Sequence, residues 1–237
     1  MNKTDITLDA LKAGSLLLVN KPLKWTSFDV VNYIRKSIDV KIGHAGTLDP
    51  LATGLLILCT GKMTKQIDNY QGMEKEYIGT IILGQTTPSF DLETEITENI
   101  DASSISNDQI VNLAKTFLGV QNQTAPLYSA KKIDGERAYL KARRGEEAEI
   151  KAREIEVKEF EITNIKRLDK IIHVNFRILC SKGTYIRAIA RDFGLQLNNV
   201  ACLTNLIRTK IGDFSLESAI TLEEFKVMFP VPTKLLS

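Results

Sequence analysis

The chain of 237 residues contains only three cysteines and two histidines. Cys59, Cys180 and Cys202 lie far apart and form no Cys-x-x-Cys pair, so neither a disulfide framework nor a zinc knuckle is indicated. With His44 and His173 as its imidazoles, the sequence also offers few nitrogen ligands for a catalytic zinc ion. We therefore expect three buried thiols and no bound metal.

Long apolar runs are also missing. No run approaches the roughly 20 residues that a membrane-spanning helix needs, and the N-terminus has no apolar signal core. Hydrophobic residues make up 43% of the chain and charged residues 25%, an ordinary globular mixture that argues against extensive disorder. We expect a soluble, cytoplasmic, monomeric protein, and the length allows one large domain or two small ones.

Glutamate is absent from residues 1–66, which carry nine Lys or Arg and five Asp, a surplus of +4. Residues 74–108 have a charge of −7, and residues 109–153 return to +4. Separate basic surfaces could hold a polyanion on one face of the molecule. Charge alone favours solvated helix faces instead, because the balance does not reach the strongly basic footprint of a non-specific nucleic-acid-binding protein.

The hydrophobic pattern predicts a mixture of helices and strands. Capping boxes at Thr26-x-x-Asp29 and Ser106-x-x-Gln109 predict two amphipathic helices, the first over 27–38. Apolar or alternating runs predict strands over 54–60, 77–83, 154–165 and 171–180, the last two as a hairpin, with a helix after 181–184 and a long loop over 85–104. We therefore expect an α+β fold, in which helices pack on a mixed, largely antiparallel sheet.

Residues 43–54 contain three glycines, one proline and a single carboxylate, Asp49. Glycine permits tight turns and close approach of a ligand, and Pro50 disfavours helical geometry at Asp49. The pattern predicts a stiff loop that holds this carboxylate between two strands or helices. A purely structural turn, in which Asp49 caps a helix begun by Pro50, is favoured on local evidence alone.

The segment 181–187 lies where a predicted strand ends and a helix begins. Tyr185 and Arg187 are expected in the first helical turn, off its apolar face. An arginine at a helix start opposes the helix dipole, so we expect an acidic partner for Arg187. Asp192 or a solvated surface is the alternative to a functional partner.

Together these segments resemble the TruB family of bacterial tRNA pseudouridine synthases. The family's hallmark Gly-His-x-Gly-Thr-Leu-Asp-Pro stands at residues 43–50 and continues to Leu56. The other family segments follow in order, at Val19–Pro22 with Thr26-Ser27, Lys75-Glu76-Tyr77, Leu83–Thr87, Tyr128–Lys132, Lys182–Arg187 and Leu203-x-x-Leu206-x-Arg208. The resemblance covers roughly residues 14–215 and implies the pseudouridine synthase fold with a central active-site cleft.

Isomerising uridine breaks the N1–C1′ bond and forms a C5–C1′ bond, so nothing is oxidised and no cofactor is expected. The resemblance implies that Asp49 is the nucleophile, attacking either C1′ of the sugar or C6 of the base. It implies that Arg187 pairs with Asp49 and keeps it ionised. It also implies that Tyr77 stacks on the everted base and serves in proton transfer.

The resemblance supplies further substrate-binding residues. His44 would lie against the everted nucleotide, while Tyr185 and Leu206 would form walls of the pocket. Candidates for phosphate contacts are Lys21, Lys132 and Arg143-Arg144. Asp91 is carried over from the loop after Thr87, although this loop lacks the family's usual Asp- and Gly-rich composition.

The implied substrate is the uridine at position 55 in the T arm of tRNA, recognised as a folded loop. A non-catalytic tRNA-binding or tRNA-folding module is one alternative, and a synthase acting on ribosomal or another RNA is a second. Asp49, Tyr77 and Arg187 together favour the enzyme. Family members commonly carry a C-terminal PUA domain, but only about twenty residues follow Phe214. We therefore expect a single catalytic domain over 1–237, with a short tail over 216–237.

Overall fold

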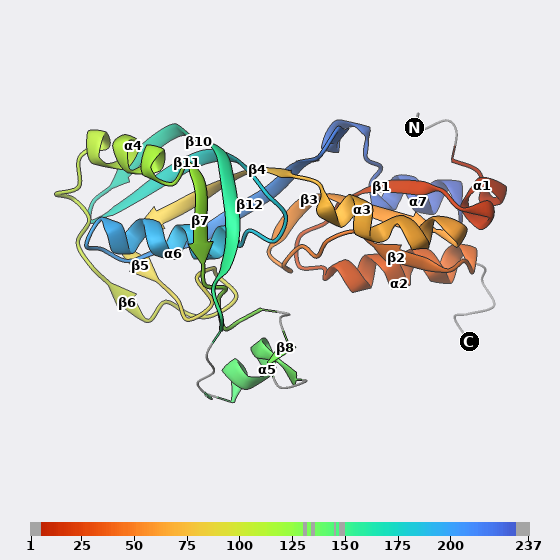
Figure 1. Cartoon of the computed structure of the whole chain (residues 1–237), viewed down its shortest axis with the longest axis horizontal. Helices are drawn as coiled ribbons and strands as arrows, with labels where there is room; N and C mark the ends of the chain where they lie inside the picture. The colour runs from red at the N-terminus through yellow and green to blue at the C-terminus, as the bar shows by residue number, and fades with distance from the viewer. Residues whose placement is uncertain (1–5, 130–131, 134–135, 145, 147–149, 231–237) are drawn as a thin grey trace. The chain divides into compact units, whose positions relative to one another are not determined.

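The computed structural model describes residues 6–129, 132–133, 136–144, 146 and 150–230 (Figure 1). The chain forms two compact units, one of residues up to Tyr77 together with those from Ile207 onward, and one of residues 78–206. Two strands, β4 (Lys75–Leu83) and β12 (Ala201–Ile211), run from one unit into the other. A single domain over the whole chain stays a prediction. No helix in the described ranges is long and apolar enough to cross a membrane.

The first unit is built on β3 (Ala52–Thr60). Its antiparallel neighbour β1 (Leu16–Lys21) pairs from Leu16 opposite Cys59 to Lys21 opposite Gly54, and the short β2 (Ile42–His44) also pairs with β3. On its other side β3 adjoins β12, which pairs with β13 (Phe214–Ser215). The helices are α1 (Leu8–Ala13), α2 (Ser27–Ile38), α3 (Ile67–Gly72) and α7 (Leu222–Met228), with 3-10 turns at Gly61–Gln66 and Leu216–Ser218.

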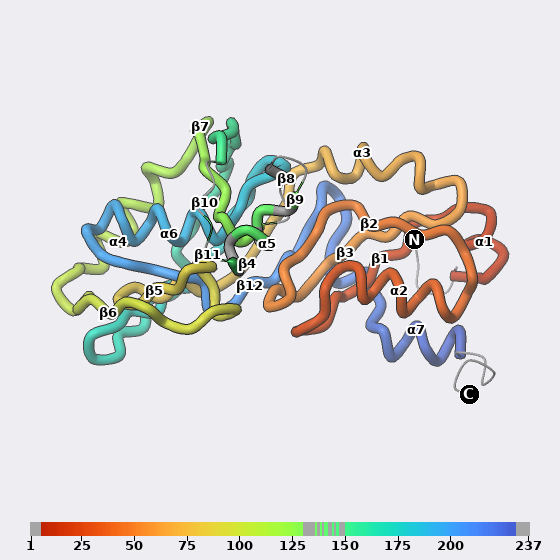
Figure 2. Tube along the Cα trace, turned by 90° about the horizontal axis from the view of Figure 1, so that it is seen from below, coloured from red at the N-terminus to blue at the C-terminus, as the bar shows by residue number. Residues whose placement is uncertain are grey.

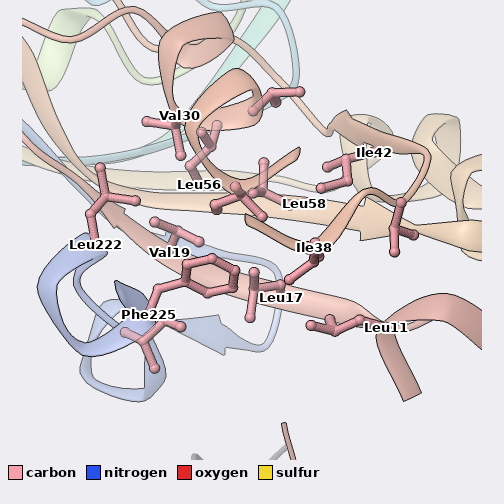
Figure 3. Close-up of a cluster of buried hydrophobic side chains, with 14 residues drawn as sticks. Leu11, Leu17, Val19, Val30, Ile38, Ile42, Leu56, Leu58, Leu222 and Phe225 are labelled. Atoms are coloured by element: carbon pink, nitrogen blue, oxygen red, sulfur yellow. The ribbon is translucent and has the colours of Figure 1, made fainter. Parts of the chain in front are cut away.

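Strand β3 is buried on both faces, which explains its unbroken apolar sequence. On one face Leu56 and Leu58 pack with residues of β1, α2 and α7, among them Phe225 (Figure 3). On the other face Leu55 and Ile57 belong to a second cluster that includes side chains of α3 and β13. This burial fixes the ends of β3, and so fixes the loop that precedes it.

The strands of the second unit follow the order β12-β4-β11-β10-β7. Its long hairpin joins β10 (Arg153–Leu168) to β11 (Ile171–Cys180), and β10 also pairs antiparallel with β7 (Gly119–Gln123). The other elements are β5 (Gln85–Thr86), β6 (Glu98–Asn99), α4 (Asn107–Thr116), β8 (Lys132–Ile133), β9 (Glu136–Arg137), α5 (Ala138–Arg143) and α6 (Ile186–Gln196). Figure 2 traces their course.

An aromatic cluster holds α4 and α6 on this sheet. Phe117 follows α4, Phe193 lies on α6, and Phe160 and Phe176 come from the hairpin. Ring centroids of contacting pairs are 5.7–5.9 Å apart, the range in which aromatic rings attract one another. The predicted amphipathic faces of the two helices therefore meet the alternating face of the hairpin.

The predicted α+β fold with a largely antiparallel sheet is confirmed. Helix 27–38 has the expected ends, because Thr26 and Asp29 form the capping box. The hairpin is confirmed, with β10 extending further in both directions than predicted. The loop over 85–104 instead contains a small antiparallel pair, β5 with β6. The alternative prediction of a helix beginning at Pro50 is wrong, because strand β3 already begins at Ala52.

Candidate active site

Asp49 lies in the loop between β2 and β3 and is half-buried. Ser27 fixes the residue before it, because the Ser27 hydroxyl accepts from the Leu48 N–H at 2.9 Å and donates to the Leu48 carbonyl at 3.2 Å. The Ala52 N–H donates to the Asp49 carbonyl at 3.1 Å. The stiff loop predicted between two secondary-structure elements is therefore confirmed, and it joins two strands.

Lys21, at the end of β1, holds this loop from the interior. Its ammonium group donates to the carbonyls of Trp25 at 2.6 Å, Pro22 at 3.0 Å and Pro50 at 3.4 Å. Burial lowers the pKa of Lys21 to about 8, although the negative charge of Asp49 acts in the opposite direction. Because the side chain has no exposed surface, its position favours support of the Asp49 loop over the predicted phosphate contact.

Arg208, on β12, is a second buried cation beside the loop. Its guanidinium donates to the carbonyls of Leu55 at 2.8 Å, Gly46 at 3.1 Å and Thr47 at 3.4 Å. Gly54 has φ +104°, and a Cβ there would collide with the Arg208 backbone. The sequence contained Arg208 only as part of a family motif, and its part in shaping the loop comes from the structure.

His44 is the last residue of β2 and lies at the start of the Asp49 loop. Burial, together with the nearby Arg208 charge, lowers the pKa of His44 below its ordinary value, and the Gly46 backbone offsets part of this effect. Nδ1 of His44 is buried, and no described residue forms a well-aligned hydrogen bond with it. A neutral imidazole at pH 7 follows, which suits contact with an uncharged nucleobase.

In the second unit Arg187 and Asp91 form a buried ion pair. Arg187 Nε lies 3.5 Å from Asp91 Oδ2, and the two side chains are 4% and 7% exposed. The guanidinium also donates to the carbonyls of Tyr128 at 2.9 Å and Ser89 at 3.0 Å. The acidic partner expected for Arg187 is therefore present. It is not Asp192, whose carboxylate pairs with Arg191.

Hydroxyl groups hold the Asp91 carboxylate in place. Asp91 Oδ1 accepts from the Ser89 hydroxyl at 2.6 Å and from the Glu93 N–H at 3.0 Å, and Ser89 lies 2.8 Å from the Thr94 hydroxyl. The Leu203 N–H on β12 donates to the Phe90 carbonyl at 3.0 Å, which anchors the loop to the sheet. Although the loop departs from the family's usual composition, it delivers its carboxylate to Arg187.

Tyr185 is the residue that precedes α6, and β7 fixes its backbone. The buried Gln123 amide donates to the Tyr185 carbonyl at 3.1 Å and accepts from the Tyr185 N–H at 2.8 Å. The side chain packs against the cluster of Ala125, Ala138 and Ile150. Tyr185 therefore lies just before α6 and not in its first turn, as had been predicted, and two hydrogen bonds hold its backbone.

The structure gathers the predicted site residues into two groups. Lys21, His44, Asp49 and Tyr77 belong to the first unit, whereas Asp91, Tyr185, Arg187 and Leu206 belong to the second. Tyr77 and Leu206 are buried strand residues of β4 and β12. The side chains of Lys132 and Arg143 lie outside the described residues. The pairing of Asp49 with Arg187, and the roles of all these residues, stay predictions.

Comparison with known proteins identifies the family. Residues 34–186 match the family described as "TruB family pseudouridylate synthase (N terminal domain)". Two relatives named tRNA pseudouridine synthase B, from Phocaeicola vulgatus and Flavobacterium johnsoniae, are 48% and 49% identical over 90% of this chain, covering 92% and 95% of their own lengths.

Solved structures agree with this assignment. The fold superposes on a chain of the crystal structure titled a Cbf5-Nop10-Gar1 complex with a TM-score of 0.70 and 27% identity, covering 93% of this chain and 56% of that chain. The expected pseudouridine synthase fold is confirmed. This chain therefore belongs to the TruB family of pseudouridylate synthases.

Proposed function

We propose that this enzyme isomerises uridine to pseudouridine at position 55 in the T arm of tRNA, with Asp49 as its nucleophile. The observation that carries the proposal is the loop over 43–54, which presents one half-buried carboxylate braced by Lys21 and Arg208. The relatives' name, tRNA pseudouridine synthase B, supports tRNA as the substrate.

The reaction leaves the elemental composition of the nucleotide unchanged. The N1–C1′ bond breaks, the base turns, C5 bonds to C1′, and the C5 proton is lost while N1 gains one. The ionised Asp49 carboxylate forms a covalent intermediate, either at C1′ of the sugar or at C6 of the base. The target uridine first leaves the stack so that the carboxylate can reach it.

Arg187 supplies the positive charge that favours the ionised form of Asp49. Because Asp91 and two carbonyls already fix its guanidinium, little rearrangement is needed when the substrate binds. Tyr77 stacks on the everted base, and Tyr185 and Leu206 line the pocket. The neutral imidazole of His44 lies against the nucleotide without adding charge.

The test uses an unmodified tRNA transcript labelled with tritium at C5 of uridine, incubated without cofactor. Tritium release and chemical mapping should report one modified uridine in the T arm. Asp49→Asn should release none and still bind the transcript. Asp39→Asn is a matched control, because Asp39 is exposed and left-handed at the end of α2, a conformation that asparagine tolerates.

The same assay separates the alternatives. A non-catalytic module would bind the transcript, and the wild-type protein would release no tritium. A synthase for another RNA would leave the tRNA unmodified and modify a ribosomal RNA fragment instead. Tritium release by Asp49→Asn at the wild-type rate would remove Asp49 from its assigned role.

A further inference from the structure

Arg153, the first residue of β10, stacks on Tyr185. Its guanidinium carbon lies 4.6 Å from the centre of the Tyr185 ring, within the range of a cation–π contact. Gly183, with φ +81°, packs against the same group, and a Cβ there would lie 3.1 Å from that carbon. Arg153 also pairs with Gln123 across the sheet. Two paired strand residues therefore hold Tyr185. Gln123 fixes its backbone, and Arg153 packs on its ring.

The hydrogen-bonding state of Arg153 sets it apart. Every other arginine whose side chain the structure describes donates to at least one carbonyl, amide oxygen or carboxylate. For Arg153, the described part of the chain provides no acceptor, and its Nε is buried. A buried donor without an acceptor is costly. The Arg153 guanidinium is therefore suited to donate to an acceptor atom of a bound ligand.

The surroundings of Arg153 indicate which ligand chemistry fits. The residue is half-buried, so part of its surface is open to solvent. Lys182, adjacent to Gly183, is exposed and adds positive charge. The next acidic residue along the strand, Glu154, points to the opposite face of the sheet, because successive strand residues alternate. An oxyanion is therefore the complementary ligand.

We propose that Arg153 binds a backbone phosphate of the RNA, next to the nucleotide that enters the pocket lined by Tyr185. This inference rests on the proposed function, which supplies the RNA and places Tyr185 at the pocket. The planar guanidinium matches two phosphate oxygens, and stacking on Tyr185 keeps it oriented. Arg153 would thus set the register of the RNA while leaving its sequence unread.

The test compares Arg153→Gln with Arg177→Gln in binding a T-arm stem-loop at several salt concentrations. Both changes remove one positive charge, but Arg177 is a half-buried residue of the hairpin paired with Glu159 and Glu161. Arg153→Gln should weaken binding about tenfold. It should also lower the slope of log K against log salt by about 0.7–0.9, the loss of one phosphate contact. Arg177→Gln should change neither quantity.

Arg153→Lys distinguishes a phosphate contact from simple support of Tyr185. Lysine keeps the charge without the planar stack, so it should restore the wild-type salt slope while binding stays weaker. An unchanged salt slope in Arg153→Gln would overturn the proposal, and so would equal effects of Arg153→Gln and Arg177→Gln. Circular dichroism confirms that each variant is folded. Tritium release by the wild-type enzyme judges the proposed function separately, because the Arg153 comparison measures binding alone.

Discussion

Removing the negative charge of Asp91 should destabilise the second unit strongly. Asp91→Asn keeps the shape of the side chain, and its oxygen can still accept from Ser89. It leaves Arg187, only 4% exposed, without a charged partner. Breaking a buried ion pair from one side costs about 3–5 kcal/mol. Since Arg187 keeps two carbonyl acceptors, we expect the lower end, about 3 kcal/mol, which lowers Tm by roughly 6–12 °C.

A double-mutant cycle with Arg187→Met tests the reason for this loss. Urea unfolding of the wild type, both single variants and the double variant gives the four free energies of unfolding. If the uncompensated Arg187 charge causes the destabilisation, Asp91→Asn should cost less than about 1 kcal/mol once Arg187 is methionine. An equal cost in both backgrounds would refute the reasoning and assign the effect to the hydroxyl network around Asp91.

Three further predictions concern the first unit. Arg208→Lys should lower kcat about 100-fold in single-turnover assays while RNA binding is retained, because the Asp49 loop loses two of its anchors. Lys21 has a pKa of about 8 when folded against 10.5 otherwise, so the unfolded chain binds more protons between these values. The free energy of unfolding should therefore rise by up to ~3 kcal/mol from pH 8 to 10.5, and Lys21→Met should lack this rise. NMR titration should give His44 a pKa below 6.5. The free energy of unfolding should therefore fall as the pH drops below 6.5. Arg208→Met should raise the pKa of His44, because it removes the nearby positive charge. A flat pH profile, an ordinary His44 pKa or unchanged kcat would contradict the respective prediction.

Local signals in the sequence were sufficient for the elements that local interactions determine. The capping box at Thr26 fixes the start of α2, and the alternating residues of 171–180 form a strand whose apolar side is buried. Strand β7 was not predicted, because Gly119–Gln123 is polar and owes its conformation to pairing with β10. The turn to β3 after Pro50 likewise depends on burial between two hydrophobic clusters, which a local capping pattern cannot show.

The sequence predicted the reactive residues of the candidate site better than the residues that hold them in place. The glycine-bounded loop singled out Asp49, and the helix dipole argument gave Arg187 an acidic partner. The identity of that partner, Asp91, depends on a contact between distant parts of the chain. The sequence alone does not reveal that the Lys21 ammonium group donates to three carbonyls. Its contact with phosphate stays a prediction.

We propose that Asp49 of the first unit and Arg187 of the second meet at one everted uridine. A crystal structure with a T-arm RNA carrying 5-fluorouridine at the target position tests it most directly, because fluorine replaces the C5 proton whose loss completes the reaction. We predict that the Asp49 carboxylate contacts the fluorinated nucleotide and lies within about 4–6 Å of the Arg187 guanidinium. A bound nucleotide remote from Asp49, or an Arg187 far from that carboxylate, would contradict the account.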